Sequence, residues 1–288
     1  MLTIGGLVFL LVCVFGTFIA SGGNIGVLAE AMPFEMISIG GAATATLVMA
    51  NSMHDVKHTL ASFGKVMKGA AFAKADYVDL LSLLFFFAKL ASSKGPMALE
   101  AHIERPDESK AFQKYPKILG NHHANAMICD YLRMVGMNAD DPYQIEDVMA
   151  REIKKTMAEE LHSAHALQTV ADSLPALGIV AAVLGVIHTM GSITEPPEVL
   201  GHLIGGALVG TFTGVLLSYT IFAPIGRNIQ LCFDTDAYYL SAIKAGLLAH
   251  MQGYAPQVSI EFARKTLPDE LRPTFQELED TVTNLPPD

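Results

Sequence analysis

The chain has 288 residues, of which 51% are hydrophobic and 17% are charged, with a formal net charge of −10. A soluble domain usually has about a quarter charged residues, so the deficit indicates that lipid is part of this chain's solvent. The acidic balance argues against nucleic acid as a partner, because nucleic-acid-binding surfaces are basic. Three cysteines without a CxxC pair are typical of a reducing compartment with no disulfide framework.

Two apolar runs lie near the start of the chain. Residues 2–20 are almost wholly apolar, and residues 36–54 contain no Asp, Glu, Lys or Arg. A helix of about 20 such residues crosses a hydrocarbon core of about 30 Å, so each run predicts a transmembrane helix. A cleaved signal peptide is the alternative for the first run, but it requires a basic start. The first Lys or Arg is Lys57, which favours a retained span.

The middle of the chain, residues 55–172, is mixed in character. Its most apolar stretch runs from Leu80 to Ala88 and is too short to span a bilayer, so it predicts a buried core helix. Residues 145–167 have the apolar spacing of an amphipathic helix. We therefore expect a large helical domain between the second and third apolar runs.

Two further apolar runs, residues 173–194 and 199–226, are each long enough to span. Pro175 begins the third run and Pro224 lies near the end of the fourth. Such prolines ordinarily cap or stop a helix, and a hinge at the membrane boundary is the alternative. The chain ends in a proline- and acid-rich tail from Pro268 that we expect to be mobile.

The basic residues set the predicted orientation. All 19 Lys and Arg fall within residues 57–155 and 227–272, and basic residues stay on the cytoplasmic side of a membrane. The sequence thus predicts an all-α, multi-pass inner-membrane protein with four transmembrane helices, in which both termini and the large middle domain are cytoplasmic. The two short outer loops carry only acidic charges, Glu30 and Glu35 in one and Glu195 and Glu198 in the other.

This topology divides the chain into four segments. Residues 1–54 would hold the first two spans and residues 55–172 the cytoplasmic domain. Residues 173–226 would hold the last two spans, and residues 227–288 a cytoplasmic helical segment and tail.

The four predicted spans contain no Asp, Glu, Lys or Arg. Because ionisable groups within a membrane mark ion pathways, a partner must supply the titrating group if this chain moves ions. A passive membrane anchor is the alternative. Thr211 is a candidate to line a polar path, although threonine often bonds to its own helix carbonyls. The fourth span also has glycines at four-residue spacing, which favour close packing against another helix: Gly206, Gly210 and Gly214.

Glu159, His162 and His165 are three residues apart on a predicted helix and would present three metal ligands on one face. An acidic, solvated helix face is the alternative that we favour. The sequence has no Gly-rich phosphate loop, nucleophile elbow or HExxH motif. We therefore expect no enzyme activity, no metal and no cofactor.

Several stretches of the chain form a joint pattern, and together they resemble the MotA family of flagellar stator subunits. The resemblance covers nearly the whole chain. It implies an ion-conducting subunit that forms a ring of five around two MotB-like, one-span, peptidoglycan-binding partners, whose aspartate accepts the proton. It also implies that ion flow turns the ring against the rotor protein FliG. The stretches are DSLPALGIVAAVLGVIH (172–188), LVGTFTGVLLSY (208–219), GYAP (253–256), IEFARKTL (260–267), YPKIL (115–119) and DYLR (130–133).

The resemblance assigns roles within the spans. Pro175 and Pro224 correspond to prolines that couple ion flow to movement, and Thr211 to a channel-facing threonine beside the partner's carboxylate. Sodium-driven relatives have a second threonine where this chain has Ala182. Sodium needs several oxygen ligands to replace its hydration shell, so H+ is the expected transported ion.

The resemblance also assigns a rotor contact in the cytoplasmic domain. Glu100 matches the family's glutamate. The family's basic residue aligns with Ser92 in this chain, which leaves Lys94 and Lys89 as its candidates.

Three alternatives remain open at this point. One is an ExbB- or TolQ-like energy-transducing ring subunit, which usually has three spans. The others are a sodium-driven stator and the passive membrane anchor.

Overall fold

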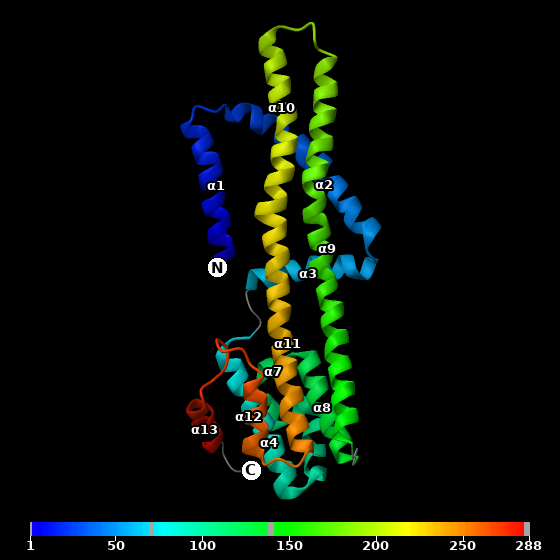
Figure 1. Cartoon of the computed structure of the whole chain (residues 1–288), viewed down its shortest axis with the longest axis vertical. Coiled ribbons are helices and arrows are strands. Elements are labelled where there is room, and N and C mark those ends of the chain that lie inside the picture. Colours follow the sequence, from blue (N-terminus) through cyan, green and yellow to red (C-terminus); the bar gives the residue numbers. More distant parts are fainter. Residues whose placement is uncertain (1, 69–71, 138–140, 285–288) are drawn as a thin grey trace. The chain divides into compact units, whose positions relative to one another are not determined.

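Every regular element of the described chain is a helix (Figure 1). The computed structural model describes residues 2–68, 72–137 and 141–284, and no strand occurs among them. The prediction of an all-α chain is therefore confirmed.

The helices form two compact units. Unit 1 comprises residues 1–69 and 159–232, and unit 2 comprises residues 70–158 and 233–288. Two long helices, α9 (Pro142–Met190) and α11 (Ala223–Met251), each contribute to both units.

Unit 1 consists mainly of long apolar helices that leave large hydrophobic side chains uncovered. Phe9, Ile37 and Ile187 are 72%, 75% and 62% exposed. Water does not favour so much exposed apolar surface, whereas lipid does. The elements of unit 1 are α1 (Leu2–Ala20), α2 (Ile25–Ala50), α3 (Met53–Lys68), the C-terminal part of α9, α10 (Pro197–Leu216), the π-helical turn η3 (Leu217–Phe222) and the start of α11.

Three helices of the described chain are long and apolar enough to cross a membrane. They are α2, α9 and the helix that runs from Pro197 to Met251 through α10, η3 and α11. A shorter apolar helix covers Ile4–Ala20. A multi-pass membrane protein is therefore supported, and the first predicted span coincides with the shorter helix.

Unit 2 is built around α4 (Lys74–Lys94), which contains the predicted core segment. Side chains from Leu80 to Ala88 are buried there except Phe86, so the prediction of a buried core helix is confirmed. Helices α12 and α13 both contact α4. The other elements of unit 2 are η1 (Pro96–Leu99), α5 (Glu100–Ile103), η2 (Pro106–Glu108), α6 (Lys110–Gln113), α7 (Pro116–Gly120), α8 (His122–Gly136), α12 (Pro256–Lys265) and α13 (Phe275–Thr283).

The second apolar helix begins earlier than the sequence suggested. The expected start was residue 36, but α2 begins at Ile25, where the side chain of Asn24 accepts a hydrogen bond from the backbone N–H of Gly26. Such an N-cap satisfies one of the free donors of the first helical turn. Glu30 and Glu35 therefore lie within α2 and not in a loop.

The prolines neither start nor stop the long helices. Pro175 lies inside α9, which continues from Pro142 to Met190. Pro224 lies in the first turn of α11, and the helix continues through it from Pro197 to Met251. The capping interpretation is wrong at both positions, because the chain remains helical on both sides of each proline.

The C-terminal tail is more ordered than expected. Residues 275–283 form α13, in which Leu278 and Val282 are buried. The helix begins with a capping box, in which Thr274 and Glu277 exchange side-chain and backbone hydrogen bonds. The buried pair and the cap explain why an acid-rich segment is helical here.

Candidate functional site

Glycines bring α9 and α10 into close contact in unit 1. A Cβ atom placed on Gly214 would lie 2.6 Å from the carbonyl oxygen of Leu174 and 2.8 Å from the Cα atom of Gly178. A Cβ on Gly210 would lie 3.1 Å from the backbone nitrogen of Ala182. Because these obstacles are backbone atoms, the contact requires glycine, and the predicted close packing is confirmed for these two glycines.

The third glycine of the motif faces a different helix. A Cβ on Gly206 would lie 3.8 Å from the side chain of Ala31 on α2, which is ordinary van der Waals contact. Gly210 borders α2 as well, since its Cβ would lie 2.8 Å from Oε2 of Glu35. The three glycines therefore face two neighbouring helices: Gly210 and Gly214 face α9, and Gly206 and Gly210 face α2.

Glu35 is a residue that the sequence reasoning did not place in the second apolar helix. Its Oε2 atom is buried and has no hydrogen-bond partner, as is Oγ1 of Thr213 on α10. Among the described residues of unit 1, these are the two buried side-chain polar atoms without such a partner. The charge-free run of residues 36–54 covers only part of this helix, because α2 also carries Glu30 and Glu35. The N-cap signal at Asn24 could have revealed it, because it extends the helix beyond the charge-free run.

The two residues assigned to the ion path lie at the contact made by Gly210. Thr211 follows Gly210 on α10 and is half-buried, and Ala182 is buried on α9 against that glycine. Ala182 has no side-chain oxygen, so the hydroxyl groups at this contact come from α10. Their participation in ion passage stays a prediction.

A hydrogen bond joins the stretch of α9 that contains Pro175 to the stretch of the α10–α11 helix that contains Pro224. The hydroxyl of Ser218 donates to the carbonyl oxygen of Ala171 at 2.6 Å. Ser218 lies in η3, where the N–H of Ala223 donates to the carbonyl of Ser218, five residues back. Pro175 follows Ala171 by one helical turn, and Pro224 directly follows Ala223. The sequence showed Ser218 as one of several hydroxyls, but it did not show its partner.

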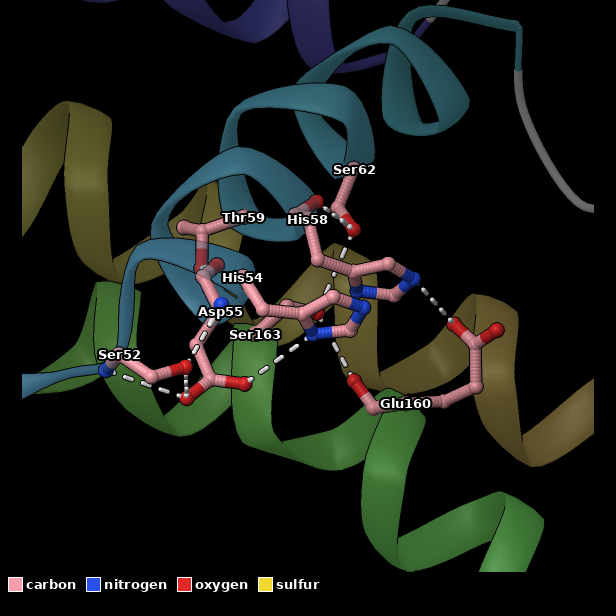
Figure 2. Close-up of polar contacts among 8 residues, drawn as sticks. All are labelled: Ser52, His54, Asp55, His58, Thr59, Ser62, Glu160 and Ser163. Carbon is pink, nitrogen blue, oxygen red and sulfur yellow. Dashed lines mark hydrogen bonds and ion pairs between the residues drawn. The ribbon is translucent and has the colours of Figure 1, made fainter.

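A set of polar contacts joins α3 to α9 within unit 1 (Figure 2). Nε2 of His58 lies 3.8 Å from Oε2 of Glu160, and the hydroxyl of Ser62 donates to that of Ser163 at 3.3 Å. At the start of α3, a hydrogen bond from the Ser52 hydroxyl lowers the pKa of Asp55. The contacts of His58 and Ser62 attach α3 to α9, and no pattern in the sequence indicated them.

The possible metal ligands are not assembled into a site. Glu159, His162 and His165 all lie exposed on α9. Within the part of the chain that the structure describes, no group of three or more His, Cys, Asp or Glu is placed to hold a metal ion. The geometry matches the solvated helix face.

The residues assigned to the rotor contact surround one turn of unit 2. Lys89 and Lys94 are exposed near the C-terminal end of α4, and Glu100 is exposed at the start of α5. Gly95 joins the two elements with a φ of +83°, which glycine adopts without strain. The structure thus gathers basic and acidic side chains at one end of α4, beside Ser92, which is also exposed. Whether they meet a rotor stays a prediction.

The cysteines have no pairing role in the structure. None of Cys13, Cys129 and Cys232 forms a disulfide in the structure, as their number and spacing predicted. Burial raises the pKa of Cys129 to about 11, so this thiol stays protonated and unreactive at neutral pH.

Comparison with known families yields two matches that together span most of the chain. Residues 4–95 match the family described as "Motility protein A N-terminal". Residues 119–237 match the "MotA/TolQ/ExbB proton channel family".

Relatives and solved structures extend these matches to nearly full length. Motility protein A of Escherichia coli (strain K12) is 38% identical over 282 residues, which cover 98% of this chain and 95% of the relative. Motility protein A of Salmonella typhimurium (strain LT2) is 36% identical over the same shares. The structure of C. jejuni MotAB aligns with a TM-score of 0.75 at 20% identity, covering 94% of this chain and 98% of that chain, which shows a shared fold.

Proposed function

We propose that this chain, which belongs to the motility protein A family, is the ion-conducting stator subunit of a bacterial flagellar motor. Identity of 38% to a motility protein over almost the whole chain supports this role. The observation that most supports it is the close contact of α9 and α10, where Gly210, the neighbour of Thr211 in the chain, packs against the backbone of Ala182. Such close packing would hold Thr211 at a fixed position relative to α9 within the lipid bilayer.

Four spans and a cytoplasmic middle domain complete the proposal. The apolar helix α1 is 19 residues long, enough to cross a hydrocarbon core of about 30 Å at a rise of about 1.5 Å per residue. The segments 1–54, 55–172, 173–226 and 227–288 keep their assigned places, with both termini in the cytoplasm. The distribution of Lys and Arg supports this orientation.

The proposed assembly includes two kinds of partner. Five copies of the chain would surround two MotB-like one-span, peptidoglycan-binding subunits, which supply an aspartate to the ion path. The exposed apolar faces of α1, α2, α9 and α10 provide surface for such neighbours and for membrane lipid. The charged turn formed by Lys89, Lys94 and Glu100 would meet the rotor protein FliG.

The transported ion in this proposal is H+, and no cofactor takes part. A proton needs a titrating acceptor and a hydrogen-bonded path, whereas sodium needs several oxygen ligands at once. Ala182 supplies no side-chain oxygen in addition to the hydroxyl of Thr211. The proton is therefore the better match to these residues.

The function is tested by expressing the chain with its MotB-like partner in a cell that lacks its own stator. We expect swimming that is indifferent to external sodium and that stops with a protonophore. A strain whose partner has its membrane aspartate changed to asparagine is the control and should not swim. Swimming that tracks sodium and survives the protonophore contradicts the assigned ion, and no swimming under any condition contradicts the stator role.

A further inference from the structure

Pro175 deprives one buried carbonyl of its helical partner. In an α-helix each backbone N–H donates to the carbonyl four residues earlier, and proline has no N–H to donate. The carbonyl that Pro175 leaves free belongs to Ala171, which is completely buried (0% exposed). A buried carbonyl without a partner is unfavourable, so a proline inside α9 requires a donor from elsewhere.

Ser218 supplies that donor from the other helix. Its hydroxyl lies 2.6 Å from the Ala171 oxygen, and the residue is 1% exposed. Several other hydroxyls of this unit bond instead to carbonyls of their own helix, as Thr44 does to Gly40 and Thr189 does to Gly185. Hydroxyls of neighbouring helices are a known means of satisfying carbonyls freed by proline in membranes.

The backbone around Ser218 allows its hydroxyl to reach the Ala171 carbonyl on α9. Gly214, one turn earlier, brings α10 so close to α9 that its Cβ would meet the Leu174 carbonyl at 2.6 Å. A short side chain such as serine can therefore bridge the remaining gap. The π-helical hydrogen bond from Ala223 to Ser218 leads directly into Pro224, and single π-turns are frequent at functional sites.

We infer that Ser218 is a positioning residue that ties the stretch of α9 ahead of Pro175 to the π-helical turn ahead of Pro224. The two proline segments then move together, because their nearest backbone turns share one buried hydrogen bond. The inference rests on the proposed stator function and on the coupling role that the family resemblance implies for both prolines.

The test is a double-substitution cycle in the complete stator with its partner. Ser218→Ala leaves the Ala171 carbonyl without a donor, whereas Pro175→Ala returns an N–H to that carbonyl. Two quantities are measured for each variant: swimming speed, and proton influx through membranes that contain the same amount of stator. The ratio of swimming speed to proton influx measures coupling. A variant that only lowered the amount of folded protein would not change this ratio.

We expect Ser218→Ala to lower swimming speed per unit of proton influx about 2- to 10-fold, because the net free energy of one hydrogen bond corresponds to a factor of this size. The same substitution in a Pro175→Ala background should change this ratio less than 2-fold, since the carbonyl already has its helical partner there. Thr189→Val is the matched control, because it removes a buried hydroxyl of α9 that bonds within its own helix, and it should match the parent chain.

Two outcomes overturn the inference. One is a Ser218→Ala variant with parental speed per unit of influx. The other is an equal loss from Ser218→Ala with and without Pro175, which would mean that the hydroxyl does not act through the freed carbonyl. Both leave the proposed function intact, because that function fails only if the unsubstituted chain gives no swimming.

Discussion

At the scale of single residues, the contact of α9 and α10 depends on glycines that meet backbone atoms. Gly214→Ala would place a methyl group 2.6 Å from the carbonyl oxygen of Leu174 and 2.8 Å from Gly178. The helices must separate to accept it, and such overpacking destabilises by about 1–3 kcal/mol. We expect a lower melting temperature of the purified protein in detergent and reduced swimming.

A glycine of the same helix offers the matched control. No atom lies within 4 Å of a Cβ placed on Gly201, so Gly201→Ala should be neutral, or stabilising by about 0.5–1 kcal/mol through its better helix propensity. If Gly201→Ala and Gly214→Ala lowered the melting temperature equally, the contact between α9 and α10 would not be the cause of the destabilisation.

The cap of α13 makes a second prediction at this scale, one that depends on pH. A hydrogen bond from Lys74, followed by one from the backbone of Thr274, lowers the pKa of Glu277 from 4.5 to about 2. A lowered pKa in the folded state means that the ionised form stabilises the fold. This contribution is complete above pH 4.5 and is lost as the pH falls towards 2.

Hydrogen–deuterium exchange of residues 275–283, corrected for intrinsic rates, measures this effect. We expect protection that is constant from neutral pH to about pH 5 and that falls below it. Glu277→Gln should show weakened protection already at neutral pH, whereas Glu279→Gln, on the exposed side of α13, should resemble the parent. A Glu277→Gln variant with full protection would rule out a stabilising cap.

At the scale of elements, the long helices continue through their prolines. Alanine supplies the N–H that proline lacks and removes its fixed φ, so Pro175→Ala and Pro224→Ala should leave membrane insertion and protein level unchanged. We expect swimming to fall strongly in both, because the restored N–H can close the interruption that each proline makes in the helical hydrogen bonds. Immunoblots of membranes and swimming assays measure the two effects, and normal swimming in both variants would reject the coupling role.

The turn between α4 and α5 carries the prediction for the rotor contact. Glu100→Lys should reduce swimming, and a reversed charge on the facing rotor residue should restore part of it. Exposed charge pairs are individually weak and salt-sensitive, which suits repeated, transient contact. Glu270→Lys, at another exposed acidic position of unit 2, is the control. If Glu100→Lys swims like the parent, Lys89 and Lys94 become the next positions to test.

At the scale of the whole molecule, topology is the decisive prediction. A reporter fused after the last residue or inserted near Gly136 should behave as cytoplasmic, and one inserted near Gly23 as periplasmic. The reason is the confinement of Lys and Arg to residues 57–155 and 227–272. Paired cytoplasmic and periplasmic reporters at each site give the measurement. A periplasmic C-terminus would contradict the four-span arrangement.

Much of this protein could be predicted from its sequence. Apolar runs long enough to cross a bilayer led to an all-α membrane chain, and the short run from Leu80 to Ala88 correctly predicted a core helix. These features are local, because length and hydrophobicity decide them within one segment. The joint pattern of motifs likewise identified the family before any contact was known.

The tertiary structure was needed to show whether the long helices continue through their prolines and which polar groups meet. The carbonyl of Ala171, which Pro175 leaves without its helical donor, receives a hydrogen bond from Ser218, 47 positions away along the chain. The position of Glu35 against Gly210 likewise depends on how α2 packs on α10. Such features arise from partners distant in sequence, and a free carbonyl or a buried carboxylate acquires its meaning only when the neighbouring helix is in place.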